Sequence, residues 1–300
     1  MPKVSIGLPV YNGERFIAEA LDSVLAQTFE DYELIILDNA STDQTPEICR
    51  TYLAKDRRIR YYRNDQNIGA ARNFNLAFEL SIGEYFKWLA DDDICAPRYL
   101  ERCVEILDKD PSVVLSYPKV RLINENGNLI YVAPSCLART ESSEPQVRFH
   151  NVLMDAFWCF EVFGLIRADV LRKTSRIGTY YGSDKVLLAE LSLLGRFKEI
   201  DEELFLRRCH SRQSTNLTVK EKAAWIDPLS KRVIPFQVEA FMGYLAAVQK
   251  ANLSSTQQLQ CCFSVTRLTL KAEKWKKLLL PGKHNYFGWR LKKRVTKEQM

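Results

Sequence analysis

Residues 4–10 read VSIGLPV and residues 32–38 read YELIILD, two short runs that are mostly apolar. Between them, residues 14–27 carry apolar side chains at helical spacing. Strands that are apolar on both faces are typical of a parallel sheet covered by helices on each side. This opening therefore predicts a strand, a crossover helix and a second, parallel strand.

The same alternation of apolar runs and helical stretches continues along the chain. It predicts an α/β domain with a Rossmann-like, mostly parallel sheet and helices on both faces. In such sheets, ligands bind at the carboxyl ends of the strands. The further strands expected are 59–62, 84–89 and 113–117, and the further helices are 43–55, 69–80 and 97–108. Residues 122–132 predict a hairpin turning at Asn-Gly, and residues 134–150 an irregular loop.

The composition is that of an ordinary folded chain with one unusual end. Of 300 residues, 46% are hydrophobic and 27% charged, which excludes a disordered chain. The net charge is +6, yet residues 267–300 alone hold eleven Lys or Arg against two acids. We expect a main α/β domain over residues 1–217 and a helical C-terminal region over residues 218–300 with a basic amphipathic tail.

Features of the sequence also bear on where the protein works. The N-terminus lacks the apolar core of a signal peptide, and no window approaches the roughly 20 apolar residues that span a bilayer. The eight cysteines are scattered without a C-x-x-C pair. We expect a cytoplasmic protein with reduced thiols, which its basic tail could hold at the inner face of a membrane.

Three adjacent acids, Asp91, Asp92 and Asp93, follow the apolar run 84–89. A divalent cation on a diphosphate commonly takes one or two carboxylates, with phosphates and water completing its shell. The structural alternative is that Asp93 caps the helix announced by Pro97. We favour the metal interpretation because the run lies at the strand edge where ligands bind.

Other polar residues follow the first three expected strands. Asp38 ends the second strand and could accept a hydrogen bond from a base or a sugar. The turn PVYNGE, residues 9–14, could meet a nucleotide with its backbone amides, and Tyr11 could stack on a base. Arg72, in NIGAARN at residues 67–73, could reach a phosphate or a base. A plain turn and a solvated arginine are the alternatives.

Two later motifs have both a chemical and a structural interpretation. Residues 180–195 read YYGSDKVLLAELSLLG and open a helix near Asp184, which is either its N-cap or a catalytic carboxylate. Residues 207–214 read RRCHSRQS and contain His210 among several arginines. Such a cluster suits a diphosphate, while solvated basic side chains are the alternative.

Taken in order, these motifs resemble those of the inverting nucleotide-sugar glycosyltransferases of family 2, which have the GT-A fold. The resemblance runs from Val4 to about Ser214. It implies metal-dependent transfer of a sugar from a nucleotide-sugar donor, UDP being the first choice, to a saccharide or lipid-linked saccharide acceptor. It also implies Mg²⁺ or Mn²⁺ as cofactor and a role in bacterial surface polysaccharide synthesis.

The resemblance further assigns roles to single residues. Asp184 becomes the general base, and Asp92, with His210 beside the diphosphate, becomes the metal site. Asp38 contacts the nucleobase and Asp91 the nucleoside. The nucleotide-sugar-binding set is Pro9, Tyr11, Asn12, Glu14, Asp38, Asn67, Arg72, Asp91, Asp92 and His210.

The motifs depart from the family pattern in two places. Ala90 stands where many members have the first Asp of D-x-D, so the roles of Asp91 and Asp93 stay interchangeable. Asn39 and Ala40 replace the more usual Asp-Gly, which leaves the nucleotide open.

Two other functions compete with sugar transfer. A nucleotidyltransferase should carry a Gly-rich loop with a basic residue after its first strand, and residues 7–16 do not resemble one. A non-catalytic, nucleotide-sugar-binding or membrane-docked protein would not need both Asp92 and Asp184.

Two regions could serve the acceptor. Phe157, Trp158 and Phe160 are expected to help select it, although such aromatics are more often part of a core. In the tail, apolar residues recur at helical spacing among basic ones, which suits an anionic membrane surface or a helix packed on the main domain. The apolar row is Leu268, Ala272, Trp275 and Leu279.

Overall fold

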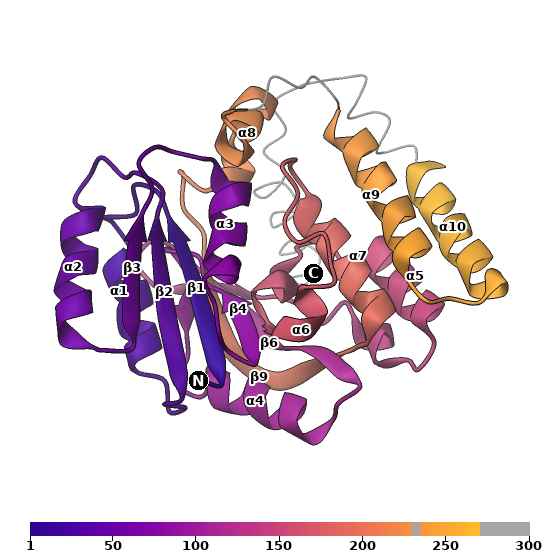
Figure 1. The fold of residues 1–300 in the computed structure, drawn as a ribbon, viewed down its shortest axis with the longest axis horizontal. Helices are drawn as coiled ribbons and strands as arrows, with labels where there is room; N and C mark the ends of the chain where they lie inside the picture. Colours follow the sequence, from indigo (N-terminus) through magenta and orange to yellow (C-terminus); the bar gives the residue numbers. More distant parts are fainter. Residues whose placement is uncertain (230–234, 271–300) are drawn as a thin grey trace, which may run out of the picture.

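The fold is built on one curled sheet with helices on both of its faces (Figure 1). The computed structural model describes residues 1–229 and 235–270. Within them the strands follow the order β3-β2-β1-β4-β8-β6-β9-β5, and β7 pairs with β6 beside that path.

The first half of the sheet is parallel, as the apolar runs predict. Strand β1 pairs with β2 and β4, and β2 pairs with β3. Every residue of β1, β2 and β4 is buried, because helices cover both faces. The bounds are β1 Val4–Val10, α1 Ile17–Leu25, β2 Tyr32–Asp38, α2 Thr45–Lys55, β3 Ile59–Arg63, α3 Ala70–Glu79 and β4 Tyr85–Trp88.

The second half of the sheet mixes directions. Strand β8 is antiparallel to both β4 and β6, whereas β9 is parallel to β6 and antiparallel to the two-residue strand β5. The expected hairpin is confirmed, because β6 and β7 pair antiparallel around a turn in which Gly127 has φ 81°. The bounds are β5 Ile94–Cys95, α4 Tyr99–Lys109, β6 Val113–Ile123, β7 Leu129–Val132, β8 Leu165–Arg167 and β9 Arg196–Arg208.

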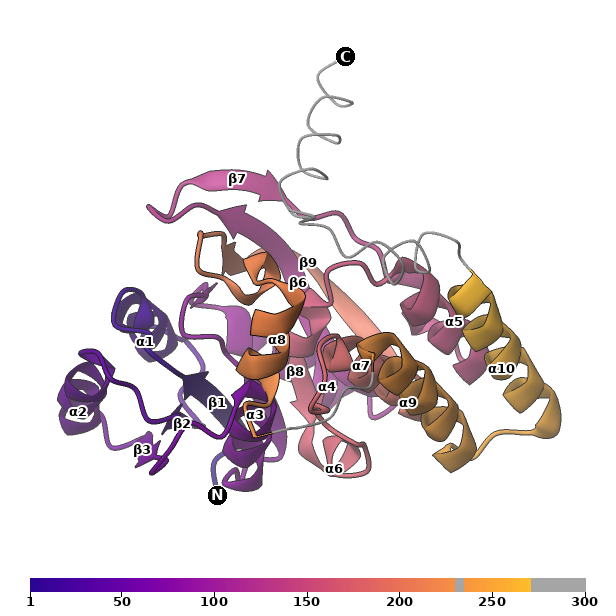
Figure 2. The same cartoon turned by 90° about the horizontal axis from the view of Figure 1, so that it is seen from above.

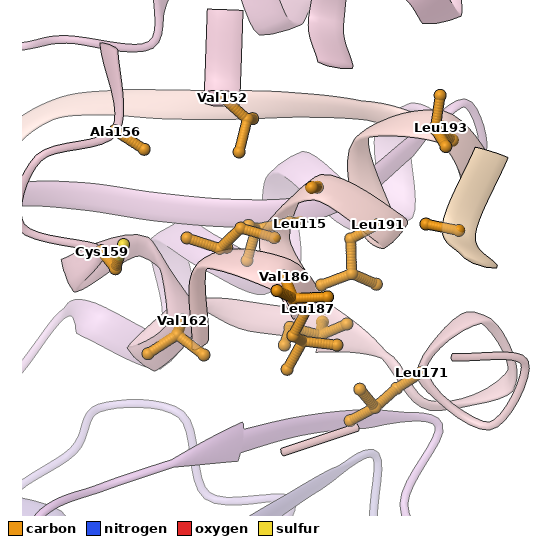
Figure 3. Packing of buried hydrophobic residues seen from close by; sticks show 14 of the residues in the cluster. Leu115, Val152, Ala156, Cys159, Val162, Leu171, Val186, Leu187, Leu191 and Leu193 are labelled. Atoms are coloured by element: carbon orange, nitrogen blue, oxygen red, sulfur yellow. The ribbon is translucent and has the colours of Figure 1, made fainter. Parts of the chain in front are cut away.

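The remaining helices pack on one face of the sheet and share a core with it. Figure 3 shows Leu115 of β6, Val152 of α5 and Leu187 of α7 within this core. Helices α9 and α10 add Tyr244 and Val265 to the same core. The bounds are η1 Ala138–Glu141, α5 Pro145–Asp155, η2 Phe160–Phe163, α6 Ala168–Leu171, α7 Ser183–Leu194, η3 Ser214–Asn216, α8 Val219–Ile226, α9 Phe236–Lys250 and α10 Ser255–Leu270. The division of the chain near residue 217 stays a prediction.

The irregular loop expected over residues 134–150 is partly wrong. Helix α5 begins at Pro145, a residue whose fixed φ suits the first helical position. Its apolar side chains Phe149, Val152 and Leu153 recur at helical spacing and are buried, so packing overrides the polar residues around them.

Helix α8 follows the last strand, β9, and lies against the first half of the fold. Figure 2 shows it lying over α3, and the two helices are in contact. Across residues 1–229 and 235–270, no helix combines the length and the apolar character that crossing a bilayer requires. The sheet edge, α7 and α8 together surround the site described next.

Candidate functional site

The acidic run meets arginines of its own chain. Because β5 pairs with the end of β9, Asp93 lies beside Arg207 and Arg208. Its Oδ1 accepts hydrogen bonds from Arg207 Nη1 at 3.0 Å and from the Arg208 backbone N–H at 2.9 Å. Burial raises the pKa of Asp93 to about 7, against the opposing charge of Arg207. The alternative in which Asp93 caps the next helix is wrong, because α4 has no side-chain cap.

The arginines were expected to suit a diphosphate, and here two of them face acids instead. Arg207 Nη1 also lies 3.4 Å from Asp92 Oδ2. The Arg208 side chain is 1% exposed and reaches Glu19 at 2.7 Å. The acidic partners compensate for the hydration that a buried arginine loses. Removing a partner would leave an unpaired charge inside the protein, which is strongly destabilising. Arg207 and Arg208 therefore fix the acidic run rather than present two free cations.

Asp92 and His210, the predicted metal pair, are in contact. His210 Nε2 lies 2.8 Å from Asp92 Oδ2, and its ring packs on Phe16 with centroids 5.2 Å apart. Burial acts to raise the pKa of Asp92, but Arg207 and His210 outweigh it and hold that pKa below its ordinary value. Asp92 is thus ionised at neutral pH.

These residues fit a cation that shares a diphosphate. Among residues 1–229 and 235–270, no three His, Cys, Asp or Glu side chains group as a metal cage. Asp92 offers carboxylate oxygens and His210 an imidazole nitrogen, so other ligands would have to come from phosphate and water. Mg²⁺ and Mn²⁺ are commonly held in that way.

Asp91 faces the first loop of the chain. A Cβ added at Gly13 would overlap Asp91 Oδ2, so this position accepts only glycine without movement. Burial and the neighbouring charges of Asp92 and Asp93 raise the pKa of Asp91 well above its ordinary value. Asp91 is therefore the member of the acidic run that packs against the loop after β1.

Those two loops are tied together by hydrogen bonds. The Asn12 backbone N–H donates to Ser41 Oγ at 2.9 Å, and Asn12 Oδ1 accepts from the Thr42 N–H at 2.7 Å. Glu14 Oε2 accepts from the Gln44 N–H at 3.0 Å. Asn12 has a φ of 54°, a conformation that asparagine tolerates better than most residues. The side chains of Asn12 and Glu14 thus position backbone around the expected nucleotide site.

Asp38 is fully buried and already bonded. Its Oδ1 accepts from the Ser41 N–H at 2.8 Å. Its Oδ2 accepts from Tyr61 Oη at 2.8 Å and from Arg63 Nη1 at 2.6 Å. A base would have to share this carboxylate or bond to the groups that surround it.

The other predicted nucleotide-binding residues lie in different surroundings. Pro9 is buried within β1, whereas Tyr11 is 44% exposed at its end. Asn67 Oδ1 accepts from the Gly69 N–H at the start of α3. Arg72 Nη2 lies 3.2 Å from Asp227 Oδ2, just after α8, so this arginine is engaged by the segment that covers it.

Asp184 stands in the first turn of α7. Its interpretation as the N-cap is wrong: the cap is Gly182, whose φ of 90° favours glycine. Asp184 Oδ1 accepts from the Lys185 N–H at 2.8 Å. Burial raises the pKa of the Asp184 carboxyl, against the opposing effects of the Lys185 N–H and charge. A carboxylate of raised pKa is a better proton acceptor near neutral pH.

Tyr181 precedes the start of α7. Burial raises the pKa of this phenol to about 12, with Asp184 adding to the shift and Arg207 opposing it. The charges of Asp184 and Arg207 thus act on the pKa of the same phenol. Lys222 of α8 lies over the same ring, 4.6 Å from its centroid.

One polar residue near Asp184 carried no signal in the sequence. Glu161 lies in η2 within the apolar stretch FWCFEVFG and follows Cys159, whose φ is 53°. Its Oε2 is buried, and within the described parts of the chain it has no hydrogen-bond partner. Burial raises the pKa of Glu161 to about 7, with added effects of Glu199 and Asp184.

Comparison with known proteins adds to this geometry. The model of "Glycosyl transferase family 2" matches residues 5–172. An uncharacterized glycosyltransferase of Rickettsia typhi is 37% identical over 131 residues, which is 43% of this chain but only 40% of that protein. The chain thus spans well under two thirds of that relative.

Solved structures with similar folds extend over more of the chain. S. aureus TarS in complex with UDP-GlcNAc has a TM-score of 0.67 at 17% identity and covers 92% of this chain and 75% of its own. The mannosyltransferase PcManGT of Pyrobaculum calidifontis, in complex with GDP-Man and Mn²⁺, has a TM-score of 0.54 at 16% identity, with coverages of 92% and 83%. The predicted α/β fold of GT-A type is confirmed.

Proposed function

The chain belongs to glycosyl transferase family 2, and from that premise we propose that it moves a sugar from a nucleotide-sugar donor to a hydroxyl of a saccharide or lipid-linked saccharide acceptor. One observation carries the proposal. Two carboxylates have opposite character: Asp92, in contact with His210, has a lowered pKa, and Asp184, in the first turn of α7, has a raised pKa. The ionised Asp92 suits a ligand of the cation that stabilises the leaving group, and Asp184 suits a general base.

The donor occupies the loops after β1, β2 and β4. In this proposal Asp38 lies at the nucleobase and Asp91 at the ribose. UDP is the first choice, supported by the UDP-GlcNAc complex of TarS, and GDP is the second, because PcManGT has a related fold. Arg72 bonds Asp227 through Nη2 alone, so its other N–H groups can reach the donor.

Asp92 and His210 would hold Mg²⁺ or Mn²⁺. A bound cation supplies charge that stabilises the departing nucleoside diphosphate. Side chains of the protein hold this site in position before the cation binds. Arg207 bonds Asp93, which keeps the acidic run in place, and His210 orients the ionised Asp92. The PcManGT complex with Mn²⁺ supports a divalent ion of this kind.

Asp184 takes the proton of the acceptor hydroxyl. A bond forms between that oxygen and the anomeric carbon, while the bond from the same carbon to the diphosphate oxygen breaks. One displacement from the opposite face inverts the anomeric configuration. The proton moves to an Asp184 oxygen, whose raised pKa suits this task.

A panel of nucleotide sugars tests the proposal. The purified chain is incubated with UDP-sugars and GDP-sugars, with Mn²⁺ or with a chelator, and the released nucleotide is identified. We expect release of UDP or GDP that requires the metal and disappears in Asp184→Asn. Consumption of added pyrophosphate, with formation of UTP or GTP and a sugar 1-phosphate, would identify a nucleotidyltransferase instead. Binding of the nucleotide sugar without release of a nucleotide would identify a non-catalytic protein.

The cellular setting belongs to the same proposal: synthesis of a bacterial surface polysaccharide, with the basic tail at an anionic membrane. Ala272, Trp275 and Leu279 lie outside the described residues. Leu268 is 3% exposed and packs in the core, which supports the packed-helix alternative at that position. Cosedimentation with anionic vesicles, compared between the full chain and one ending at residue 270, tests the tail. Equal partitioning would exclude it as an anchor.

A further inference from the structure

A small cavity lies at the loop that precedes β8, and none of the predicted nucleotide-binding residues line it. It measures about 30 Å³ and opens between β6, β9 and the loop of residues 157–161. Aromatic rings, the Tyr117 phenol and the carboxyl groups of Glu161 and Glu199 line it. This combination of flat apolar surface with a few polar groups is typical of a small-molecule site.

The polar wall of the cavity is incompletely bonded. Glu199 bonds to Ser135 Oγ, whereas the buried Oε2 of Glu161 has no hydrogen-bond partner in residues 1–229 and 235–270. Leaving a buried polar atom unpaired costs about 1–3 kcal/mol, so native structures rarely do it without a reason. A cavity of this size has room for about two water molecules, or for a hydroxymethyl group of a ligand.

The apolar wall offers a flat surface beside Glu161. The rings of Trp158 and Phe160 are nearly parallel, with 8° between their planes and 5.8 Å between their centroids. Phe157 is 55% exposed at the same loop. Rings of this kind pack against the C–H faces of a sugar, while a neighbouring carboxyl group bonds to its hydroxyls.

The loop is joined directly to the start of α7. Lys185 Nζ donates to the Ala156 carbonyl oxygen at 2.8 Å, and η2 packs on α7. The charges of Lys185 and Asp184 also affect the pKa of the Glu161 carboxyl, in opposite directions. A sugar held on this loop would therefore lie next to the predicted base.

We propose that the cavity is the acceptor subsite, in which Glu161 bonds the hydroxymethyl group of an uncharged sugar whose ring packs on the 157–161 loop. This inference rests on the proposed function. The cavity admits the exocyclic arm and not the ring, which limits recognition to that arm. Glu161 and Glu199 together disfavour an acidic sugar, because a third carboxyl group would be brought against them.

Methyl glycosides that differ only at C6 test the subsite. Methyl glucoside and galactoside carry the hydroxymethyl group, methyl xyloside and arabinopyranoside lack it, and the methyl uronides replace it by a carboxylate. Binding is followed by saturation-transfer NMR in the presence of UDP or GDP with Mn²⁺. We expect at least one hydroxymethyl compound to bind about tenfold more tightly than its counterpart without the group, and the uronides to bind most weakly.

Variants separate recognition from structure. Glu161→Met keeps the size but removes the hydrogen bond, so it should abolish the preference for the hydroxymethyl group, whereas Glu161→Gln should restore most of it. Glu202→Met, on β9 and paired with Arg102 outside the cavity, is the matched control and should keep the preference. Calorimetric titration with the nucleotide should give the same affinity for all four proteins.

Each contrary outcome has its own meaning. If neither UDP nor GDP binds the wild-type chain, the proposed function fails. If a nucleotide binds but no glycoside does, or the hydroxymethyl group brings no preference, the subsite is excluded. It is equally excluded if Glu161→Met retains the preference while Glu161→Gln behaves as wild type.

Discussion

The loops on the proposed donor side and the cavity on the proposed acceptor side treat their polar groups differently. Asp38 is fully buried and accepts three hydrogen bonds from Ser41, Tyr61 and Arg63. Glu161 is also deep in the protein, yet its Oε2 has no partner in the described chain. The carboxylate at the proposed nucleobase position is thus fully bonded before a ligand arrives, whereas the carboxyl group in the acceptor cavity has an oxygen that a ligand can satisfy. Asp93 Oδ2, in the acidic run, is likewise buried without a partner in the described chain.

The sheet explains this difference. Parallel strands β1, β2 and β3 end at one edge, so their loops converge and can bond to one another. The acceptor side is assembled from β6, β9 and η2, which are distant in the sequence. Such a side can change its specificity by substitution without disturbing the donor loops. The following predictions test this contrast.

The largest effect is expected from Asp92→Ala. Removing the ionised Asp92 takes away the carboxylate proposed for the metal, and metal-dependent transfer should fall by about 10³-fold or more. The fold should persist, because Arg207 keeps its bond to Asp93 and one repulsive charge is lost. Steady-state transfer assays and thermal unfolding measure both. Asp201→Ala, at a carboxylate whose side chain is 89% exposed, is the control, and unchanged transfer by Asp92→Ala would exclude the assignment.

Asp184→Asn should separate chemistry from donor binding. The amide oxygen can still accept from the Lys185 N–H, but it cannot take the acceptor proton, so transfer should fall by about 10²–10⁴-fold. Nucleotide affinity, measured by calorimetry, should stay within about twofold of wild type, since Asp184 does not line the donor loops. Asp169→Asn on the surface of α6 controls for the substitution. Near wild-type transfer by Asp184→Asn would mean that the base lies elsewhere.

The donor side could largely be predicted from the sequence. Asp38 and the acids after β4 follow apolar runs directly, so their positions at the sheet edge need only the strand pattern. The partners of those acids could not be predicted. Arg207 meets Asp93 through the two-residue strand β5, and Arg72 meets Asp227 across 155 positions.

The acceptor side offered even less to sequence reasoning. Glu161 lies among apolar residues whose pattern indicates only a core, and nothing local shows that its carboxyl is unbonded. Its position depends on the left-handed conformation of Cys159 and on the packing of η2 against α7. Likewise, the cap of α7 is a glycine beside the more conspicuous Asp184.

Gly13→Ala tests the tightness of the donor side. The added Cβ overlaps Asp91 Oδ2, and overpacking typically costs about 1–3 kcal/mol. Where the strain is relieved by moving Asp91 away from the proposed ribose position, nucleotide binding should weaken by about 5- to 150-fold. Gly127→Ala is a suitable control, because it lies in the β6–β7 turn with open space around it. It should lower stability through its φ of 81° but leave nucleotide affinity unchanged. Wild-type affinity in Gly13→Ala would show that Asp91 moves freely.

The smallest expected effect is a pH-dependent stability carried by Glu161. Its pKa rises from an ordinary 4.5 to about 7 in the folded protein, chiefly because of burial. Between these values the folded state binds more protons than the unfolded state, so the free energy of unfolding falls as the pH rises from 4.5 to 7. Glu161→Gln cannot ionise, and relative to it the wild type should lose on the order of 2 kcal/mol between pH 4.5 and pH 8. Asp93 has a similar pKa but is present in both proteins, so the difference between their urea-unfolding free energies isolates Glu161. As a control, Glu202→Gln should show the same pH dependence of unfolding free energy as the wild type. Parallel pH profiles for wild type and Glu161→Gln would mean that the Glu161 carboxyl already has its hydrogen-bond partners. The contrast between the two sides would then be lost.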